Sequence, residues 1–376
     1  MSRSDLPVEY TPRHQAVPRR HRGRVALFVS LAVVLIVAVA AGGYVYSLMN
    51  TFNTKTQTVD AGIASRPIEE IDGPRNILLL GTDSRGEGND VADVKGEDGQ
   101  RSDTMMIVHI PEDREDVYVM SMVRDLWVEI PGHGERKVNA ALNLGGYPLV
   151  VDTMEELVGV RIDNVVSVDF EGFSSLTEAL GGVTLDNPNE FCTGHANPTC
   201  FEEGEIHLEG NDALRFVRER KAFLEGDFQR VANQQLFIKA VMRGFLNAET
   251  LSNPVRIYDI VDKFSGYLTV DETLDSSAMA GLVGSIKNIR ANDVHFFTIP
   301  TGPGSKIGNA EIITQDPEAM EALRLALTED DLEGFLANDS WTNAYGNPIT
   351  GGQSDADASE TPPSEAPAQD GTGVGE

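Results

Sequence analysis

The sequence predicts an α/β domain of the α-β-α type, with a central mixed sheet flanked by helices and one transmembrane helix before it. Short apolar runs, typical of buried strands, alternate with longer segments whose apolar residues have helical spacing. Hydrophobic residues form 41% of the 376 positions, which is enough for a sizeable core. An uncharged apolar run near the N-terminus is long enough to cross a bilayer.

The N-terminal segment predicts the topology of the chain. Residues 25–49 contain no charged side chain, and six arginines precede them against one aspartate and one glutamate. The excess of arginine places residues 1–24 in the cytoplasm, as a basic tail, and makes the domain extracytoplasmic. A cleaved signal peptide is the alternative, but the apolar run is too long for an ordinary signal core. We therefore expect an uncleaved single-pass anchor at residues 25–49.

The net charge of the chain limits the classes of molecule that it can bind. The formal net charge is -29, and beyond residue 50 there are 24 basic and 57 acidic residues, a net charge of -33. Such a surface repels nucleic acid, so a DNA-binding function is disfavoured. It also repels an anionic substrate, unless a local basic pocket or a bound cation reverses the field.

The expected elements follow one another in a strand-and-helix pattern. Residues 50–73 are polar and predict a stalk, and the domain should occupy residues 74–350. We expect strands at residues 76–80, 105–110, 117–123, 165–170 and 293–299. We expect helices at residues 140–158, 172–180, 227–246 and 276–289.

Glycine and proline mark breaks in these helices. The helix at residues 140–158 should be interrupted near Gly145, Gly146 and Pro148, and Gly181 with Gly182 should cap the helix at residues 172–180. Residues 351–376 are rich in Gly, Ser, Pro, Ala and acidic residues without an aromatic residue, so we expect a disordered acidic tail.

The two cysteines, Cys192 and Cys200, flank a polar loop outside the predicted membrane segment. A disulfide is expected, because the compartment is oxidising and the loop is short and turn-rich. His195 lies between them, but four suitable metal ligands are not in evidence.

A concentration of arginines at residues 215–221 (RFVRERK) and 226–230 (GDFQR) stands out against the acidic background. Arginine matches phosphate oxygens in a bidentate way, so these arginines predict a phosphate or pyrophosphate site. A solvated helix face with Arg–Glu pairs is the alternative.

The spacing of these residues constrains the site. Arg218 and Arg220 are two residues apart, so they converge on one ligand only if the helix ends or loosens near Glu219. Gly226 should break the segment, and Asp227 is expected to be the N-cap of a new helix. Arg230 and Gln234 share one face of that helix, whose start adds a partial positive charge.

Carboxylates follow or precede two predicted strands. Asp83 lies in Gly81–Arg85 and Asp103 in Arg101–Thr104, so neighbouring strands would bring the two carboxylates together. Two close carboxylates favour a bound cation, and hard oxygen ligands suit Mg²⁺ (or Mn²⁺). Alternatively, each aspartate caps a turn and pairs with Arg85 or Arg101.

Two further basic residues, Arg124 after the third strand and Lys137, are candidate phosphate contacts, although surface solvation is the more common role of a single basic residue.

Taken together, GTDSR, RSDT, the VRD strand end, KVNAA, and ALRFVRER followed by GDFQRVANQQ resemble the LytR-CpsA-Psr family over residues 75–247. Members of this family are phosphotransferases that move a glycopolymer from a polyprenyl-pyrophosphate carrier onto peptidoglycan. The resemblance implies that Asp83 and Asp103 bind Mg²⁺, and that Asp83, Asp103 and Arg124 are catalytic. It assigns the pyrophosphate to Arg85, Arg124, Lys137, Arg218, Arg220 and Arg230, with Gln234 beside it. Asn233 departs from the family pattern, since many members carry an arginine there.

The implied reaction agrees with these residues. A muramic-acid hydroxyl attacks the sugar-linked phosphate and polyprenyl phosphate leaves, which requires positioning and charge neutralisation. Asp83 or Asp103 is the candidate general base. Apolar faces of the helices at residues 140–158 and 227–246 are candidates for the slot of the carrier lipid, although such faces are more often ordinary core.

Two alternative functions use the same site: a hydrolase that releases phosphate from the carrier, and a non-catalytic sensor of the carrier lipid. A Ser–His–Asp arrangement and a Walker motif are not visible in the sequence, so acyl transfer and nucleotide hydrolysis are not supported.

Overall fold

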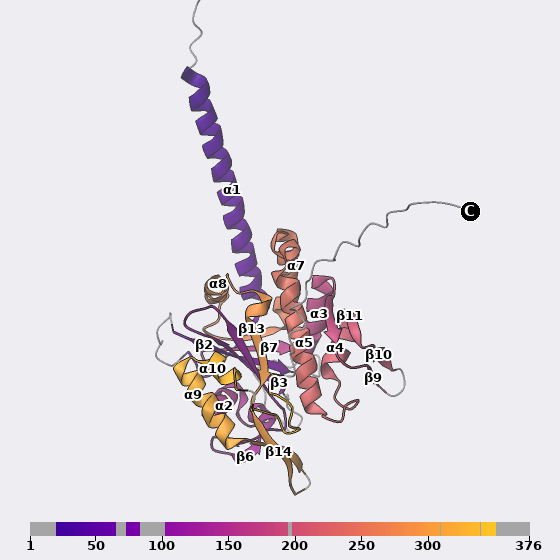
Figure 1. Cartoon of the computed structure of the whole chain (residues 1–376). Helices are drawn as coiled ribbons and strands as arrows, with labels where there is room; N and C mark the ends of the chain where they lie inside the picture. The colour runs from indigo at the N-terminus through magenta and orange to yellow at the C-terminus, as the bar shows by residue number, and fades with distance from the viewer. Residues whose placement is uncertain are drawn as a thin grey trace, which may run out of the picture. The chain divides into compact units, whose positions relative to one another are not determined.

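The structure, a computed structural model, describes residues 20–64, 73–82, 102–194, 198–308, 310–338 and 340–350 (Figure 1). Within these ranges the side chains of residues 20–34, 36, 103, 170, 173 and 248 are not described. The chain divides into two compact units, Met1–Asn50 and Thr51–Glu376. The predicted tail at residues 351–376 lies outside the described residues, as do residues 1–19.

Helix α1, Arg20–Lys55, contains the whole predicted anchor segment at residues 25–49. Leu35, Val37 and Val39 of this helix are exposed. Among the described residues, no helix combines the length and the apolar character needed to cross a membrane.

A mixed sheet of seven strands forms the centre of the second unit among the described residues, with the order β1-β12-β7-β2-β3-β4-β13. Its strands are β1 Gln57–Val59, β2 Arg75–Thr82, β3 Ser102–Ile110, β4 Val117–Met122, β7 Asn164–Asp169, β12 Leu268–Asp271 and β13 Val294–Thr298. The β1–β12, β7–β2 and β4–β13 pairs are parallel, and the other neighbours are antiparallel. This sheet confirms the predicted central mixed sheet.

Helices and hairpins surround the sheet. The further helices are α2 Ala141–Val158, α3 Phe170–Leu180, α4 Gly210–Arg218, α5 Asp227–Leu246, α6 Ala248–Leu251, α7 Pro254–Phe264, α8 Ser276–Ser285, α9 Pro317–Glu329 and α10 Leu332–Leu336. The hairpins pair β5 Trp127–Ile130 with β6 Gly134–Lys137, β8 Val183–Asn187 with β11 Gly204–Leu208, β9 Phe191–Thr193 with β10 Thr199–Phe201, and β14 Thr301–Ile307 with β15 Ala310–Gln315.

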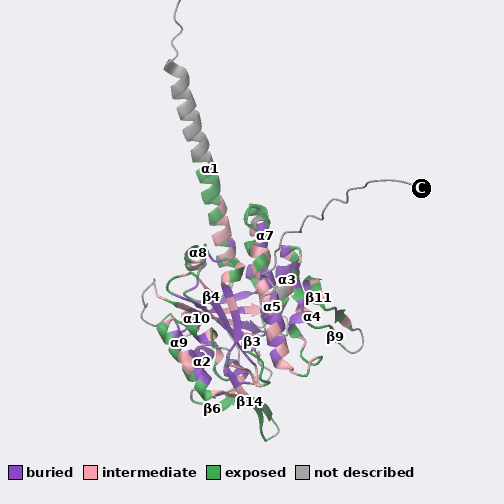
Figure 2. Cartoon of the chain, viewed as in Figure 1, coloured by how far each residue is buried: buried purple, intermediate pink, exposed green. Residues whose placement is uncertain are grey.

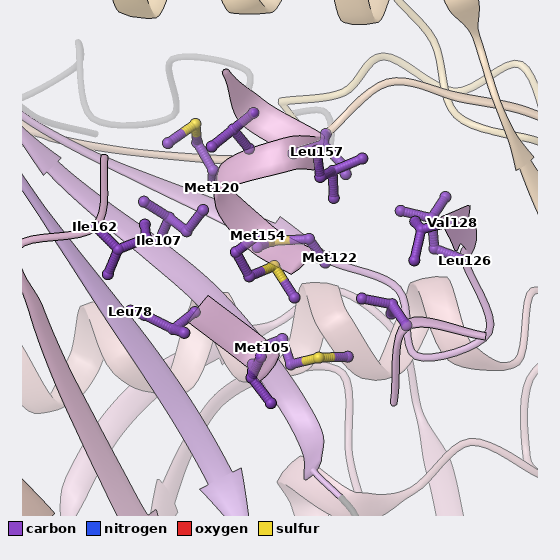
Figure 3. Packing of buried hydrophobic residues seen from close by; sticks show 14 of the residues in the cluster. Leu78, Met105, Ile107, Met120, Met122, Leu126, Val128, Met154, Leu157 and Ile162 are labelled. Atoms are coloured by element: carbon purple, nitrogen blue, oxygen red, sulfur yellow. The ribbon is translucent and has the colours of Figure 1, made fainter. Parts of the chain in front are cut away.

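The two faces of the sheet are covered by different helices, because side chains alternate along each strand. Leu78 and Met105 belong to a core that also contains residues of α2, α9 and α10, and Figure 3 shows side chains of β2, β3, β4 and α2 gathered in it. Ile77 and Met106 belong to a second core, against which residues of α5 and α8 pack. Figure 2 shows the strands of the sheet as mostly buried. The layers are therefore helix, sheet and helix, as predicted.

A third core lies beside the sheet. It joins helices α3, α4, α5 and α7 with the β8–β11 and β9–β10 hairpins, and Phe216 of α4 and Phe237 of α5 are fully buried in it. Phe191 and Phe201, which face each other at the open end of the β9–β10 hairpin, both contact the ring of Phe216. This core fixes the position of α4, which carries part of the arginine segment.

Several predicted details are confirmed. Helix α2 is kinked at Gly146, whose φ is 69°, and Pro148 lies inside it. Helix α3 ends at Gly181 in the left-handed conformation, with φ 73°. These are the backbone angles that favour glycine.

The stalk predicted at residues 50–73 is partly wrong. Strand β1 pairs with β12 at the edge of the sheet, and the last turn of α1 contacts α7 through a 2.6 Å ion pair between Lys55 and Asp262. Strand β1 is held by backbone hydrogen bonds to β12 and its sequence is polar, without an alternation of apolar residues. The sequence pattern therefore gave no sign of this strand.

Replacing Leu78 with alanine should lower the free energy of unfolding by about 2–5 kcal/mol, because it leaves a cavity in the core on the sheet. Leu78 has 0% exposure, whereas Leu325 of α9 is 57% exposed. Leu325→Ala is the matched control and should change stability by less than about 0.5 kcal/mol. Urea titration followed by circular dichroism measures both, and equal effects would contradict this assignment of the core.

Candidate functional site

The first part of the predicted site lies where β2 and β3 meet. These strands are neighbours, which is the condition on which the approach of Asp83 and Asp103 depends, and their register shifts so that Gly81 faces Thr104 and Thr82 faces Ser102. Asp103 is therefore the extra residue of a β-bulge, a feature that redirects a side chain and is common next to active sites. Asp83 and Arg85 lie outside the described residues, and the side chain of Asp103 is not described.

Buried polar groups line this end of the sheet. The hydroxyl groups of Thr82 and Ser167 lie 3.4 Å apart, on the adjacent strands β2 and β7. Tyr147 of α2 is buried, and burial raises the pKa of its phenol, whose oxygen has no hydrogen-bond partner among the described residues. The sequence analysis did not identify Tyr147 or Ser167, because a single hydroxyl in an apolar segment carries no pattern.

The second part of the site lies between α4 and α5. Helix α4 ends at Arg218, so the predicted end of the helix near Glu219 is confirmed. The Glu219 carboxylate accepts backbone N–H bonds from Arg220, Lys221 and Ala222 at 3.0, 2.7 and 3.1 Å, which stabilises the turn that follows. Arg218 and Arg220 are both exposed.

The start of α5 differs from the prediction. Gly226, with φ 54°, is the N-cap and Asp227 is the first helical residue, so the assignment of Asp227 as N-cap is wrong. The left-handed backbone at this position favours glycine. The carboxylate of Asp227 is thereby available for contacts outside its own helix.

Asp227 connects two of the predicted phosphate contacts. Its Oδ2 accepts the backbone N–H of Arg124 at 2.8 Å, and its Oδ1 forms an ion pair with Arg230 one turn further along α5. Burial raises the pKa of this carboxyl, and the positive charge of Arg230 opposes the shift. The segment after β4 and the first turn of α5 are therefore held together by one largely buried carboxylate.

Lys137 reaches the same region from the β5–β6 hairpin. Its ammonium group lies 2.9 Å from Asp125, which follows Arg124 in the chain. Lys137 is thus linked to the Asp227–Arg230 ion pair through two adjacent residues: Asp125 binds Lys137, and the backbone of Arg124 binds Asp227. The sequence analysis missed the roles of Asp125 and Asp227, for which only their places beside Arg124 and Gly226 gave a signal.

The inner face of α5 is polar near its start. Arg230, Asn233 and Gln234 are all buried, with 3%, 1% and 5% exposure. The Gln234 amide donates to the carbonyl of Val217 at 3.3 Å, which ties α5 to the last turn of α4. Asn233 accepts a 3.0 Å hydrogen bond from Gln229. Gln234 Oε1 and Asn233 Nδ2 have no hydrogen-bond partner among the described residues.

The structure therefore brings most of the described candidates together. Contacts connect the segments that carry Arg124, Lys137, Arg230 and Gln234, and Arg218 lies at the end of α4 next to Val217. Arg220 lies in the connection between α4 and α5. The apolar faces of α2 and α5 that were candidates for a lipid slot pack as core, since Val151, Met154, Phe228 and Val231 share one buried cluster.

The disulfide between Cys192 and Cys200 is present and joins directly opposed residues of β9 and β10. His195 lies outside the described residues. The described residues contain no group of three or more His, Cys, Asp or Glu side chains suited to a metal ion.

Because its folded pKa is raised, Asp227 favours the folded state less as the pH rises from about 4, the usual aspartate pKa, through the raised value. Asp227→Asn should therefore gain stability relative to the wild type over that range, and the difference should level off at higher pH. Urea titrations at a series of pH values measure it.

Asp275, the N-cap of α8, is the matched control, because backbone hydrogen bonds lower the pKa of its carboxyl. Asp275→Asn should lose stability relative to the wild type as the pH rises through the acid range. The same pH trend in both variants would contradict the opposite environments assigned to the two carboxylates.

Curated proteins resemble this chain over most of its length. It is 30% identical to the polyisoprenyl-teichoic acid–peptidoglycan teichoic acid transferase TagU of Halalkalibacterium halodurans, over 76% of this chain and 90% of that protein. It is 32% identical to the probable cell wall biosynthesis protein LcpB of Corynebacterium glutamicum, over 68% of this chain and 59% of that protein.

Solved structures share the fold. The crystal structure of B. subtilis TagV aligns with a TM-score of 0.59 and 25% identity, covering 70% of this chain and 98% of that one. A structure of TagT bound to LI-WTA aligns with a TM-score of 0.54 and 23% identity, over 70% of this chain and 94% of that one.

The family comparison covers both the sheet and the arginine-bearing helices. The model of the LytR_cpsA_psr family matches residues 44–329, which include every described residue of the site. With its mixed sheet, the bulge at Asp103 and the basic residues gathered around α5, the chain belongs to the LytR_cpsA_psr family.

Proposed function

We propose that this protein transfers a glycopolymer from a polyprenyl-pyrophosphate carrier to peptidoglycan. A muramic-acid hydroxyl oxygen forms a bond to the phosphorus that carries the glycan. The bond from that phosphorus to the bridging oxygen breaks, and polyprenyl phosphate leaves with the electron pair. The hydroxyl proton passes to a general base, for which Asp83 and Asp103 are the candidates.

One observation carries this proposal. In a chain of net charge -29, contacts join three segments that carry Arg124, Lys137 and Arg230 around the start of α5, and the exposed Arg218 and Arg220 lie at the end of α4 and just after it. A pyrophosphate needs such a local reversal of the field, because the rest of the surface repels it. The relatives named as teichoic acid transferases act on a substrate of the same chemical class.

The buried and the exposed basic residues have different roles in this proposal. Arg230 is buried and oriented by Asp227, so it can meet a phosphate oxygen without reorganising. Arg218 and Arg220 are exposed and can close around the ligand from the α4–α5 connection. Arg124 adds positive charge on the side of the sheet, whereas Lys137, paired with Asp125, is a contact of fixed position rather than a source of net charge. This arrangement suits phosphoryl transfer, which depends on positioning and on neutralising negative charge.

Asp83 and Asp103 are the proposed Mg²⁺ (or Mn²⁺) ligands. The register of β2 and β3 supports this assignment, because Thr82, which precedes Asp83 in the sequence, and the bulged Asp103 lie at one end of the same strand pair. Carboxylate oxygens are the ligands that such a cation prefers. When bound, the cation would neutralise charge on the phosphate oxygens.

We also propose that residues 25–49 of α1 anchor the protein in the membrane, with the basic tail at residues 1–24 in the cytoplasm and the domain outside. The absence of charge in this segment and the six preceding arginines support the topology. The Cys192–Cys200 disulfide fits an oxidising compartment. A carrier lipid in the same membrane would then be within reach of the domain.

Arg220→Ala should reduce kcat/KM for transfer by about 100-fold, since removing one preorganised contact to transition-state charge typically costs that much. The assay uses the full chain in vesicles with polyprenyl-pyrophosphate oligosaccharide, uncross-linked glycan and Mg²⁺, with mass spectrometry of the products. Lys306→Ala removes an exposed positive charge from the β14–β15 hairpin and should leave the rate unchanged.

The products in this assay separate the candidate functions. A phosphodiester-linked glycan that requires Arg220 supports the transferase. Free glycan phosphate without a joined product would indicate a hydrolase, and bound carrier without turnover would indicate a sensor.

The anchor is tested by placing charge in α1. Val37→Arg with Val39→Arg should release the protein from the alkali-washed membrane fraction, since each arginine near the centre of a spanning helix costs about 2.5–3.5 kcal/mol. Val37→Leu with Val39→Leu is the matched control and should remain in the membrane. Retention of the arginine variant would contradict the anchor.

A further inference from the structure

A pocket of about 480 Å³ lies between α4 and the β9–β10 hairpin. It is lined by Thr193, Gly194, Asn211, Leu214, Arg215, Arg218 and Glu219. Arg218 belongs to the proposed pyrophosphate site, whereas Arg215, one turn earlier on the same helix face, has no role there. The pocket therefore extends away from the pyrophosphate site along α4.

Arg215 is held in place without a carboxylate. Its Nη1 donates to the hydroxyl of Thr199 on β10, and no carboxylate of the described residues forms an ion pair with it. Acidic residues are nevertheless frequent in the flanking sequence, at Glu202, Glu203 and Asp212. Because the guanidinium of Arg215 forms no ion pair with a described carboxylate, its positive charge can attract an anionic ligand.

Glu219 does not cancel this charge completely. Its carboxylate already accepts three backbone N–H bonds from the turn after α4, which stabilise its negative charge. The pocket thus combines two guanidinium groups with the polar side chains of Thr193 and Asn211 and the apolar side chain of Leu214. Such a mixture suits a sugar unit that carries one anionic group.

The hairpin wall of the pocket is rigidly attached to α4. The disulfide joins its two strands at Cys192 and Cys200, and the rings of Phe191 and Phe201 lie 5.4 and 5.3 Å from that of Phe216. Thr193 and Thr199 are therefore presented to α4 in a fixed geometry. A preformed wall reduces the entropy that a ligand must lose on binding.

We propose that this pocket, with Arg215 as its specific contact, binds an oxyanion carried by the glycan next to the pyrophosphate. This inference rests on the proposed function and narrows its substrate to a glycan with an anionic group near the carrier. The group is a phosphodiester or a uronate carboxylate, which share the same bidentate geometry with arginine.

The test compares three carrier-linked donors of equal length, one with a glycerol-phosphate unit, one with a uronate and one neutral. Arg215→Ala should raise KM about tenfold for an anionic donor, the effect of a lost charged hydrogen bond, and leave kcat unchanged. KM for the neutral donor should not change. Arg215→Lys should recover part of the affinity, and Lys287→Ala, which removes an exposed charge elsewhere, should have no effect.

The anionic donor that responds identifies the source of the oxyanion. An equal rise in KM for the neutral donor, or no change for either anionic donor, would overturn the inference. The Cys192→Ser, Cys200→Ser variant should weaken the preference for the anionic donor over the neutral one, because the hairpin loses its fixed position. An unchanged preference would count against the role of the hairpin.

A second measurement separates this inference from the proposed function. If the wild type turns over no donor, the proposed function fails, and the pocket is tested by calorimetry with the lipid-free anionic oligosaccharides. Binding that is lost in Arg215→Ala still supports the pocket. Binding that is equal in the wild type and the variant overturns it.

Discussion

The largely buried carboxylate of Asp227 is the constraint on which the site depends. It accepts a hydrogen bond from the backbone N–H of Arg124, which follows β4, and it forms an ion pair with Arg230 on α5. Asp227 therefore connects the end of a central strand to helix α5. Burying an arginine without a partner would be costly, and removing one partner of a buried pair leaves an uncompensated charge. Asp227 therefore keeps a guanidinium inside the domain, oriented before any ligand arrives. The raised pKa of its carboxyl reflects the unfavourable desolvation that the pair has to overcome.

The acidity of the chain gives this arrangement its specificity. A net charge of -29 repels anions in general, so an anionic substrate is held only where several cations act together. Arg230 is largely neutralised by Asp227, and Lys137 by Asp125. Net positive charge must then come from the exposed arginines at the end of α4 and just after it. Under the proposed function, the buried residues would orient the ligand, whereas the exposed arginines and the proposed cation would supply most of the attraction.

Much of the fold followed from the sequence, because its signals were local. Apolar runs such as residues 105–110 and the glycines at 146 and 181 determine strands, kinks and caps through nearest neighbours. The contribution of β1 and the contacts of Asp125 and Asp227 depend on partners far away in the sequence. Asp227 in particular satisfied the pattern of an N-cap, but Gly226 took that position because its backbone is left-handed. The site was predicted as a set of residues, whereas the contacts that orient them required the tertiary structure.

Asn233 is an uncharged residue at a buried position of α5 beside the Asp227–Arg230 ion pair. It is 1% exposed on α5, one turn after Arg230, and hydrogen bonds to Gln229. The family resemblance assigns an arginine to this position. A second buried guanidinium beside Arg230 would need its own carboxylate, because Asp227 is already shared between Arg230 and the backbone of Arg124. Asparagine avoids that cost and keeps an amide donor facing the interior. The chain thus has one buried cation fewer than that pattern, and under the proposed function more of the recognition of the anion would fall to Arg218 and Arg220 outside the core.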